Sequence, residues 1–82
     1  MCQFSTIFFV EGNPVKYEVW LNGGIYILHP SENPNQFIAP PMLQAQQKNG
    51  RWEVSGTADR DLIDQAVEDL ESYQNKHRLG IT

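Results

Sequence analysis

The side chains that could carry chemistry are one cysteine, two histidines and ten carboxylates. A metal centre needs three or four converging donors, and neither His29 nor His77 lies in an H-x-x-x-H or C-x-x-C pattern. A cation at the end of a helix explains His77 more simply, because it complements the helix dipole. We therefore predict no metal ligand and no catalytic histidine.

Six acidic side chains crowd one segment near the C-terminus: Asp59, Asp61, Asp64, Glu68, Asp69 and Glu71. A calcium-binding loop arranges such ligands around a central glycine, which this segment lacks. Carboxylates spaced along a helix point in different directions, so the segment is predicted to be solvated helix surface rather than a cation site.

Cys2 would become an N-terminal nucleophile if Met1 were removed. Such a nucleophile also needs an oxyanion hole and a substrate pocket, and no G-x-S-x-G, P-loop or G-x-G-x-x-G pattern accompanies it. The prediction is that the chain is not an enzyme, has no catalytic residues and takes no cofactor. A single cysteine also closes no internal disulfide, which favours the cytoplasm.

Length and charge limit the remaining functions. The 82 residues are expected to form one domain, residues 1–82, with a net charge of −4 and a pI near 4.9. The chain has only six lysines and arginines, and this scarcity of positive charge disfavours binding to phosphate backbones and to anionic membranes. The first apolar run, residues 3–10, is too short to cross a membrane. We expect no nucleic-acid partner and no membrane partner, but a protein partner or a homodimer.

One helix is predicted from about residue 58 to 78, and it positions the acidic side chains described above. Its apolar positions recur at spacings of one, three and four and form a single stripe. The stripe consists of Leu62, Ile63, Ala66, Val67, Leu70 and Tyr73. Thr57 or Asp59 is placed to cap its first turn, and Lys76, His77 and Arg78 place positive charge in its last turn.

Strands are predicted at about residues 3–10, 15–21, 25–29, 43–48 and 51–55, with a short edge strand at 36–39 left open. Turn signals separate them, and Pro30 is expected to end the third strand. The fold class predicted is therefore α+β: a two-layer protein with an antiparallel meander sheet of four or five strands and one C-terminal helix packed on one face.

Alternation assigns the strand residues to two faces. With Val10 opposite Val15, Phe4 and Phe8 share a face with Tyr17 and Val19, which we call the inner face and expect the helix to cover. The other side is the outer face. In the last hairpin, Asn49-Gly50 predicts a two-residue turn that pairs Gln47 with Trp52 and Ala45 with Val54.

Trp20 lies on the outer face in every register. A two-residue loop after Asn22 places Ile25 and Ile27 beside Trp20 and sends Tyr26 and Leu28 inward, whereas a three-residue loop reverses these pairs. Ile7 and Phe9 are expected to enlarge this apolar patch.

An exposed apolar patch often marks a partner site. The leading hypothesis is thus a small protein-interaction module that binds a protein, or another copy of itself, through Trp20, Ile7, Phe9 and Glu18. The alternative is a small-molecule site between the outer face and loop 30–41, lined by Phe37, His29 and Trp20. In a third interpretation the loop simply closes over the outer face.

Overall fold

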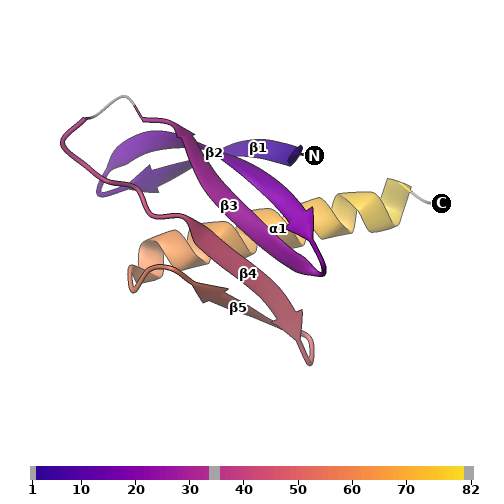
Figure 1. Cartoon of the computed structure of the whole chain (residues 1–82). Helices are drawn as coiled ribbons and strands as arrows, with labels where there is room; N and C mark the ends of the chain where they lie inside the picture. The colour runs from indigo at the N-terminus through magenta and orange to yellow at the C-terminus, as the bar shows by residue number, and fades with distance from the viewer. Residues whose placement is uncertain (1, 34–35, 81–82) are drawn as a thin grey trace.

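The computed structural model describes residues 2–33 and 36–80, with side chains as far as Lys76. Its elements are β1 (Cys2–Val10), β2 (Asn13–Asn22), β3 (Ile25–Glu32), β4 (Leu43–Lys48), β5 (Arg51–Ser55) and α1 (Arg60–Gly80). The five strands form one antiparallel sheet in the order β1-β2-β3-β4-β5, and α1 packs against one side of it (Figure 1). The predicted α+β meander with one C-terminal helix is confirmed.

The first hairpin differs from the prediction by two residues. Val10 pairs with Asn13 and Phe8 pairs with Val15, so Val10 does not lie opposite Val15. Glu11 and Gly12 have φ angles of 51° and 79° and form a tight two-residue turn. Pro14 therefore lies within β2, and because β3 pairs with β2 only from Lys16 onward, no neighbour on that side needs the N–H that proline lacks.

The second hairpin takes the two-residue loop. Trp20 pairs with Ile27 and Val19 with Leu28, so Tyr26 and Leu28 are buried on the inner face. β3 does not end at Pro30 as predicted but continues to Glu32. Pro30 is accommodated because the register shifts between Lys16 and Tyr17, and strand bulges are among the few places in a sheet that tolerate proline.

The third hairpin has the predicted register, with Ala45 opposite Val54 and Gln47 opposite Trp52. β5 ends at Ser55, and the next residue, Gly56, has a φ angle of +106°. A Cβ atom at this position would lie 2.3 Å from the carbonyl oxygen of Met42. The strand can therefore leave the sheet here only because residue 56 has no side chain. Residues 36–39 form no strand.

Helix α1 begins one residue after Asp59, not at 58. The Oδ1 atom of Asp59 accepts hydrogen bonds from the amides of Asp61 and Leu62 at 3.0 and 3.4 Å, so Asp59 is the N-cap. Thr57 Oγ1 instead accepts a bond from the Asp59 amide. The predicted stripe faces the sheet, with Leu62, Ala66 and Leu70 buried. His77 and Arg78 lie outside the described side chains.

The core between the two layers joins this stripe to the inner face of the sheet. Its buried members are Phe8, Val10, Val15, Tyr17, Val19, Tyr26, Leu28, Leu43, Ala45, Leu62, Ala66 and Leu70. Aromatic pairs link the elements: the Phe8 and Tyr17 ring centroids lie 5.1 Å apart, and Phe4 stacks on Tyr73 at 4.5 Å.

One side of α1 is bonded along β1, which the prediction of a fully solvated polar surface missed. The side-chain amide of Gln65 accepts a bond from the Phe9 N–H at 2.8 Å and donates one to the Phe9 carbonyl at 2.9 Å. Thr6 Oγ1 donates to a carboxylate oxygen of Asp69. Because Gln65 and Asp69 are one helical turn apart, α1 runs along the edge of β1. Gln65 also bonds the backbone N–H and carbonyl of Phe9, which a further strand would otherwise bond.

The segment between β3 and β4 folds toward the inner face. Tyr17 donates a hydrogen bond to the Pro41 carbonyl at 2.7 Å, and Ile38 packs against the buried core. Phe37 projects into solvent and is 98% exposed. The interpretation in which this loop closes over the outer face is therefore wrong, because its anchoring contacts lie on the helix side.

Candidate functional site

The outer face of the sheet carries an apolar patch around Trp20. Trp20 is 37% exposed and pairs with Ile27, while Ile25 lies diagonally across on the same strand as Ile27. Both isoleucines are half-buried. Trp20 thus has the two apolar neighbours that the sequence predicted, and the two-residue loop decides that they are the isoleucines.

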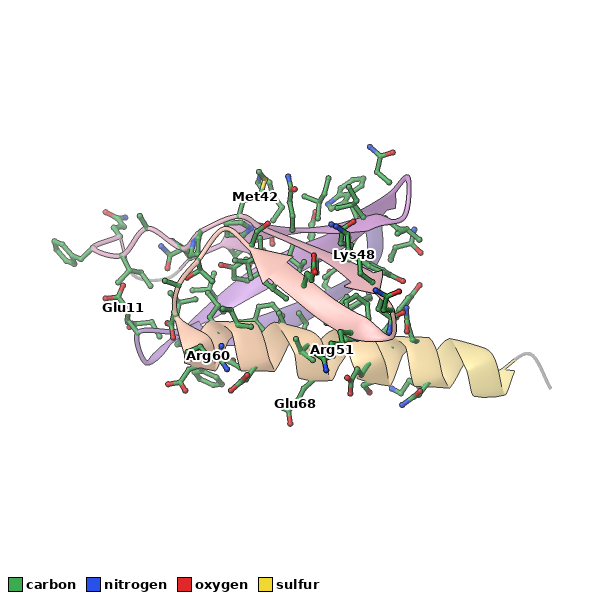
Figure 2. The ribbon with its side chains drawn as sticks, turned by 90° about the horizontal axis from the view of Figure 1, so that it is seen from below. Glu11, Met42, Lys48, Arg51, Arg60 and Glu68 are labelled. Atoms are coloured by element: carbon green, nitrogen blue, oxygen red, sulfur yellow. The ribbon has the colours of Figure 1, made fainter. Side chains whose placement is uncertain are left out.

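Met42 extends this patch, and sequence reasoning missed it. Leu43 pairs with Leu28 and points inward, so the preceding Met42 lies beside His29 on the outer side. Its side chain is 50% exposed and projects away from the helix layer, whereas Glu68 points away on the opposite side (Figure 2). Strand parity counted back from Leu43 would have found it. We call Trp20, Ile25, Ile27 and Met42 the Trp20 patch.

The structure does not bring Ile7 and Phe9 into the Trp20 patch. Ile7 lies opposite Lys16 and Phe9 lies opposite Pro14, whereas Trp20 lies opposite Cys2. Lys16 and Trp20 are four residues apart along β2, which corresponds to about 13 Å. Ile7 and Phe9, each more than half exposed, instead form a second apolar patch with Pro14. The expectation of one continuous patch failed because the first hairpin is shifted by two residues.

Polar side chains separate the two patches. Glu18 lies between Ser5 and His29 in the register, and its side chain is half-buried. Lys16 is the next residue of β2 on the outer face, two positions before Glu18. Its ammonium group lies 3.9 Å from the Glu32 carboxylate. The outer face therefore consists of apolar and polar rows that run across the strands, and most of its charges already have a neighbour of opposite sign.

The outer face is hollowed at its far end, next to the start of the β3–β4 loop. The hollow has a volume of about 510 Å³ and is lined by Ile7, Pro14, Lys16, Glu32 and Asn33. It lies where the small-molecule alternative expected a pocket, but the lining differs. Among the described residues, Phe37, His29 and Trp20 do not line it, because the loop turns toward the inner face and carries Phe37 into solvent.

The remaining candidates for chemistry stay apart. Cys2 is a free thiol within β1, and its Sγ donates to the Phe4 carbonyl at 3.2 Å. Within residues 2–33 and 36–80, no three His, Cys, Asp or Glu side chains gather as a metal site would require. In the same part of the chain, no helix is long and apolar enough to cross a membrane.

Charge is distributed unevenly between the two sides of the molecule. The exposed surface of α1 is acidic, with Asp61, Asp64, Glu68 and Glu71 along it. The outer face mixes both signs, and a second ion pair joins Lys48 to Glu53 at 3.7 Å. The net charge of −4 is therefore concentrated on the helix side, and the outer face offers little electrostatic repulsion to an approaching protein surface.

Comparison of the chain with models of protein families, with curated proteins and with solved structures gives no match.

Proposed function

We propose that this chain is a small protein-interaction module that binds through the Trp20 patch of its outer face. The observation that carries the proposal is an apolar surface around Trp20 on the sheet face that neither the helix nor the loop covers. Helix α1 and the β3–β4 loop both pack on the inner side, so Trp20 keeps more than a third of its surface exposed beside two isoleucines. Tryptophan is among the residues that contribute most to binding at protein interfaces.

The surroundings of the patch fit this role. Interfaces place apolar and aromatic side chains at the centre and polar side chains around them. Gln44 and Gln46 border the patch on β4, while Glu18 and His29 border it on β2 and β3. Such a border can orient a partner through hydrogen bonds. The proposal is of a binding protein rather than an enzyme, acting in the cytoplasm, where its free Cys2 would remain reduced.

Site-specific photocrosslinking tests this proposal. A benzophenone amino acid replaces Trp20 in one variant and Glu68, on the acidic helix surface, in a matched control. Both are expressed in cells that make the chain naturally, irradiated and analysed by denaturing gel and mass spectrometry. We expect a discrete protein adduct from position 20 and none from position 68. Equal labelling at the two positions, or none at position 20, would contradict the proposal.

The hollow of about 510 Å³ favours small-molecule binding as a second candidate. Its wall combines the apolar Ile7 and Pro14 with the Lys16–Glu32 ion pair, a composition suited to a small amphipathic compound. Amide NMR spectra recorded with a library of amphipathic fragments test this candidate. Binding should shift the Ile7 and Asn33 signals, and the shifts should be lost in Lys16→Ala. If no fragment moves these signals, the hollow is not a ligand site.

A further inference from the structure

We infer that the partner of the outer face is a second copy of the chain, packed outer face to outer face about a two-fold axis that runs parallel to β2 and β3. The inference rests on the proposed function and names the partner of that same surface. Its basis is the register of the two strands, because their outward residues form three consecutive complementary pairs: Lys16 with Glu32, Glu18 with His29, and Trp20 with Ile27.

The symmetry uses these pairs directly. The two-fold axis is parallel to the strands and lies above the outer face, midway between β2 and β3. Rotation about it leaves the position of each residue along the strand direction unchanged and places β2 of one copy over β3 of the other. In such a dimer Trp20 of one copy faces Ile27 of the other. Glu18 likewise faces His29, and Lys16 faces Glu32. Each contact occurs twice, as an isologous interface requires.

Each of these contacts is physically favourable. The Trp20–Ile27 rows remove the exposed apolar surface from water. An imidazole N–H of His29 can donate to the Glu18 carboxylate. Lys16 and Glu32, already 3.9 Å apart within one copy, gain a second partner of opposite sign. Packed sheets lie about 10 Å apart, and because the axis is parallel to β2 and β3 the strands of the two copies stay aligned along all three rows.

The distribution of charge allows a second copy to approach through the outer face. A chain with a net charge of −4 repels its own copies unless they meet through a surface that does not carry that excess. The outer face meets this condition because its lysines are paired with glutamates. Face-to-face packing also leaves the acidic surface of α1, with Asp64 and Glu68, on opposite outer sides of the dimer. The result is a four-layer arrangement of helix, sheet, sheet and helix.

A charge-swap experiment by sedimentation equilibrium tests the inference. The variants Lys16→Glu and Glu32→Lys each place two like-charge contacts in the proposed dimer, so each alone should self-associate at least about tenfold more weakly than wild type. Mixed in equal amounts, they should restore association, because the new carboxylate at position 16 of one variant then faces the new ammonium at position 32 of the other. Each chain still carries its like-charged pair internally, so repair within one copy cannot explain the recovery.

Two further samples complete the experiment. Arg60→Glu and Glu68→Lys make the same kind of charge reversal on the helix and should leave association unchanged, alone or mixed. Trp20→Ser should shift wild-type dimer to monomer, with its circular dichroism spectrum retained. A wild-type chain that is monomeric at every concentration would overturn the inference, as would swap variants that behave like the helix controls. A monomer that still gives an adduct with a different protein from position 20 would overturn the inference alone and leave the proposed function standing.

Discussion

The hydroxyl of Tyr17 should make the stability of this protein depend on alkaline pH in a predictable way. Tyr17 is fully buried, donates to the Pro41 carbonyl and holds the β3–β4 loop on the inner side. Burial raises the pKa of Tyr17 from 10.0 to about 12. Since the folded state holds this proton more tightly than the unfolded state, its contribution to stability is complete below pH 10 and is lost as the pH rises toward 12.

The magnitude follows from the two pKa values. A difference of two units corresponds to about 2.7 kcal/mol in full, and linkage gives a loss of about 1.4 kcal/mol by about pH 11. The variant Tyr17→Phe cannot ionise, but it forfeits the hydrogen bond to Pro41, which costs about 1 kcal/mol at neutral pH. The wild type should therefore be more stable than the variant at neutral pH. The curves of unfolding free energy against pH for the two proteins should cross at about pH 11.

Urea unfolding at 25 °C, followed by circular dichroism at a series of pH values, measures this difference. Subtracting the free energy of unfolding of the variant from that of the wild type at each pH cancels the contribution of all other titrating groups. Points between pH 7 and 9 provide the baseline, because Tyr17 does not titrate there in either state. A free-energy difference that stays constant from pH 9 to 12 would refute the burial of the Tyr17 hydroxyl, and with it the position of the loop on the helix side.

Three further predictions concern the fold that exposes the outer face. Gly56→Ala should cost about 2–4 kcal/mol in urea unfolding because its Cβ would strike the Met42 carbonyl, whereas Gly24→Ala, where φ is +83° and space is open, should cost about 1–2 kcal/mol. Equal costs would contradict the close approach. Asp59→Ala removes the N-cap and should lower the unfolding free energy by about 1 kcal/mol, while a change within error would place the cap elsewhere. Gln65→Ala should cost about 1 kcal/mol and speed hydrogen exchange at the Phe9 amide, whereas unchanged exchange would mean that Gln65 does not protect the β1 edge.

Local signals in the sequence were sufficient for most of the fold. Asn49-Gly50 specified both the turn and the register of β4 and β5, because two positive φ angles are readily adopted there and the apolar positions agree with the two-residue loop. The stripe of α1 identified the helix and the face it buries. In the second hairpin the pattern allowed two registers, and packing of Tyr26 and Leu28 into the core selected one of them.

The two errors in the first and second hairpins have different causes. Pro30 was expected to end the third strand, but it lies beside a register shift and pairs with no β4 residue, so its missing N–H costs little. In the first hairpin Val10 was expected opposite Val15, but the two-residue turn at Glu11 and Gly12 places it opposite Asn13. The resulting shift moved Ile7 away from Trp20 and divided the predicted patch. The loop position was not predictable because it depends on long-range contacts, from Tyr17 to Pro41 and from Ile38 to the core, which have no local sequence signature.

Fluorescence of Trp20 provides the most direct test that association covers the outer face. In Trp52→Phe, Trp20 is the remaining tryptophan, and the substitution removes an indole N–H that is buried with no partner among the described residues. Acrylamide quenching is then measured over a dilution series. We expect efficient quenching in dilute solution and progressive protection as the concentration rises in parallel with dimer formation. Protection that is independent of concentration would mean that the monomer itself covers Trp20, and unprotected Trp20 in a sample shown to be dimeric would mean that the chains associate through another surface.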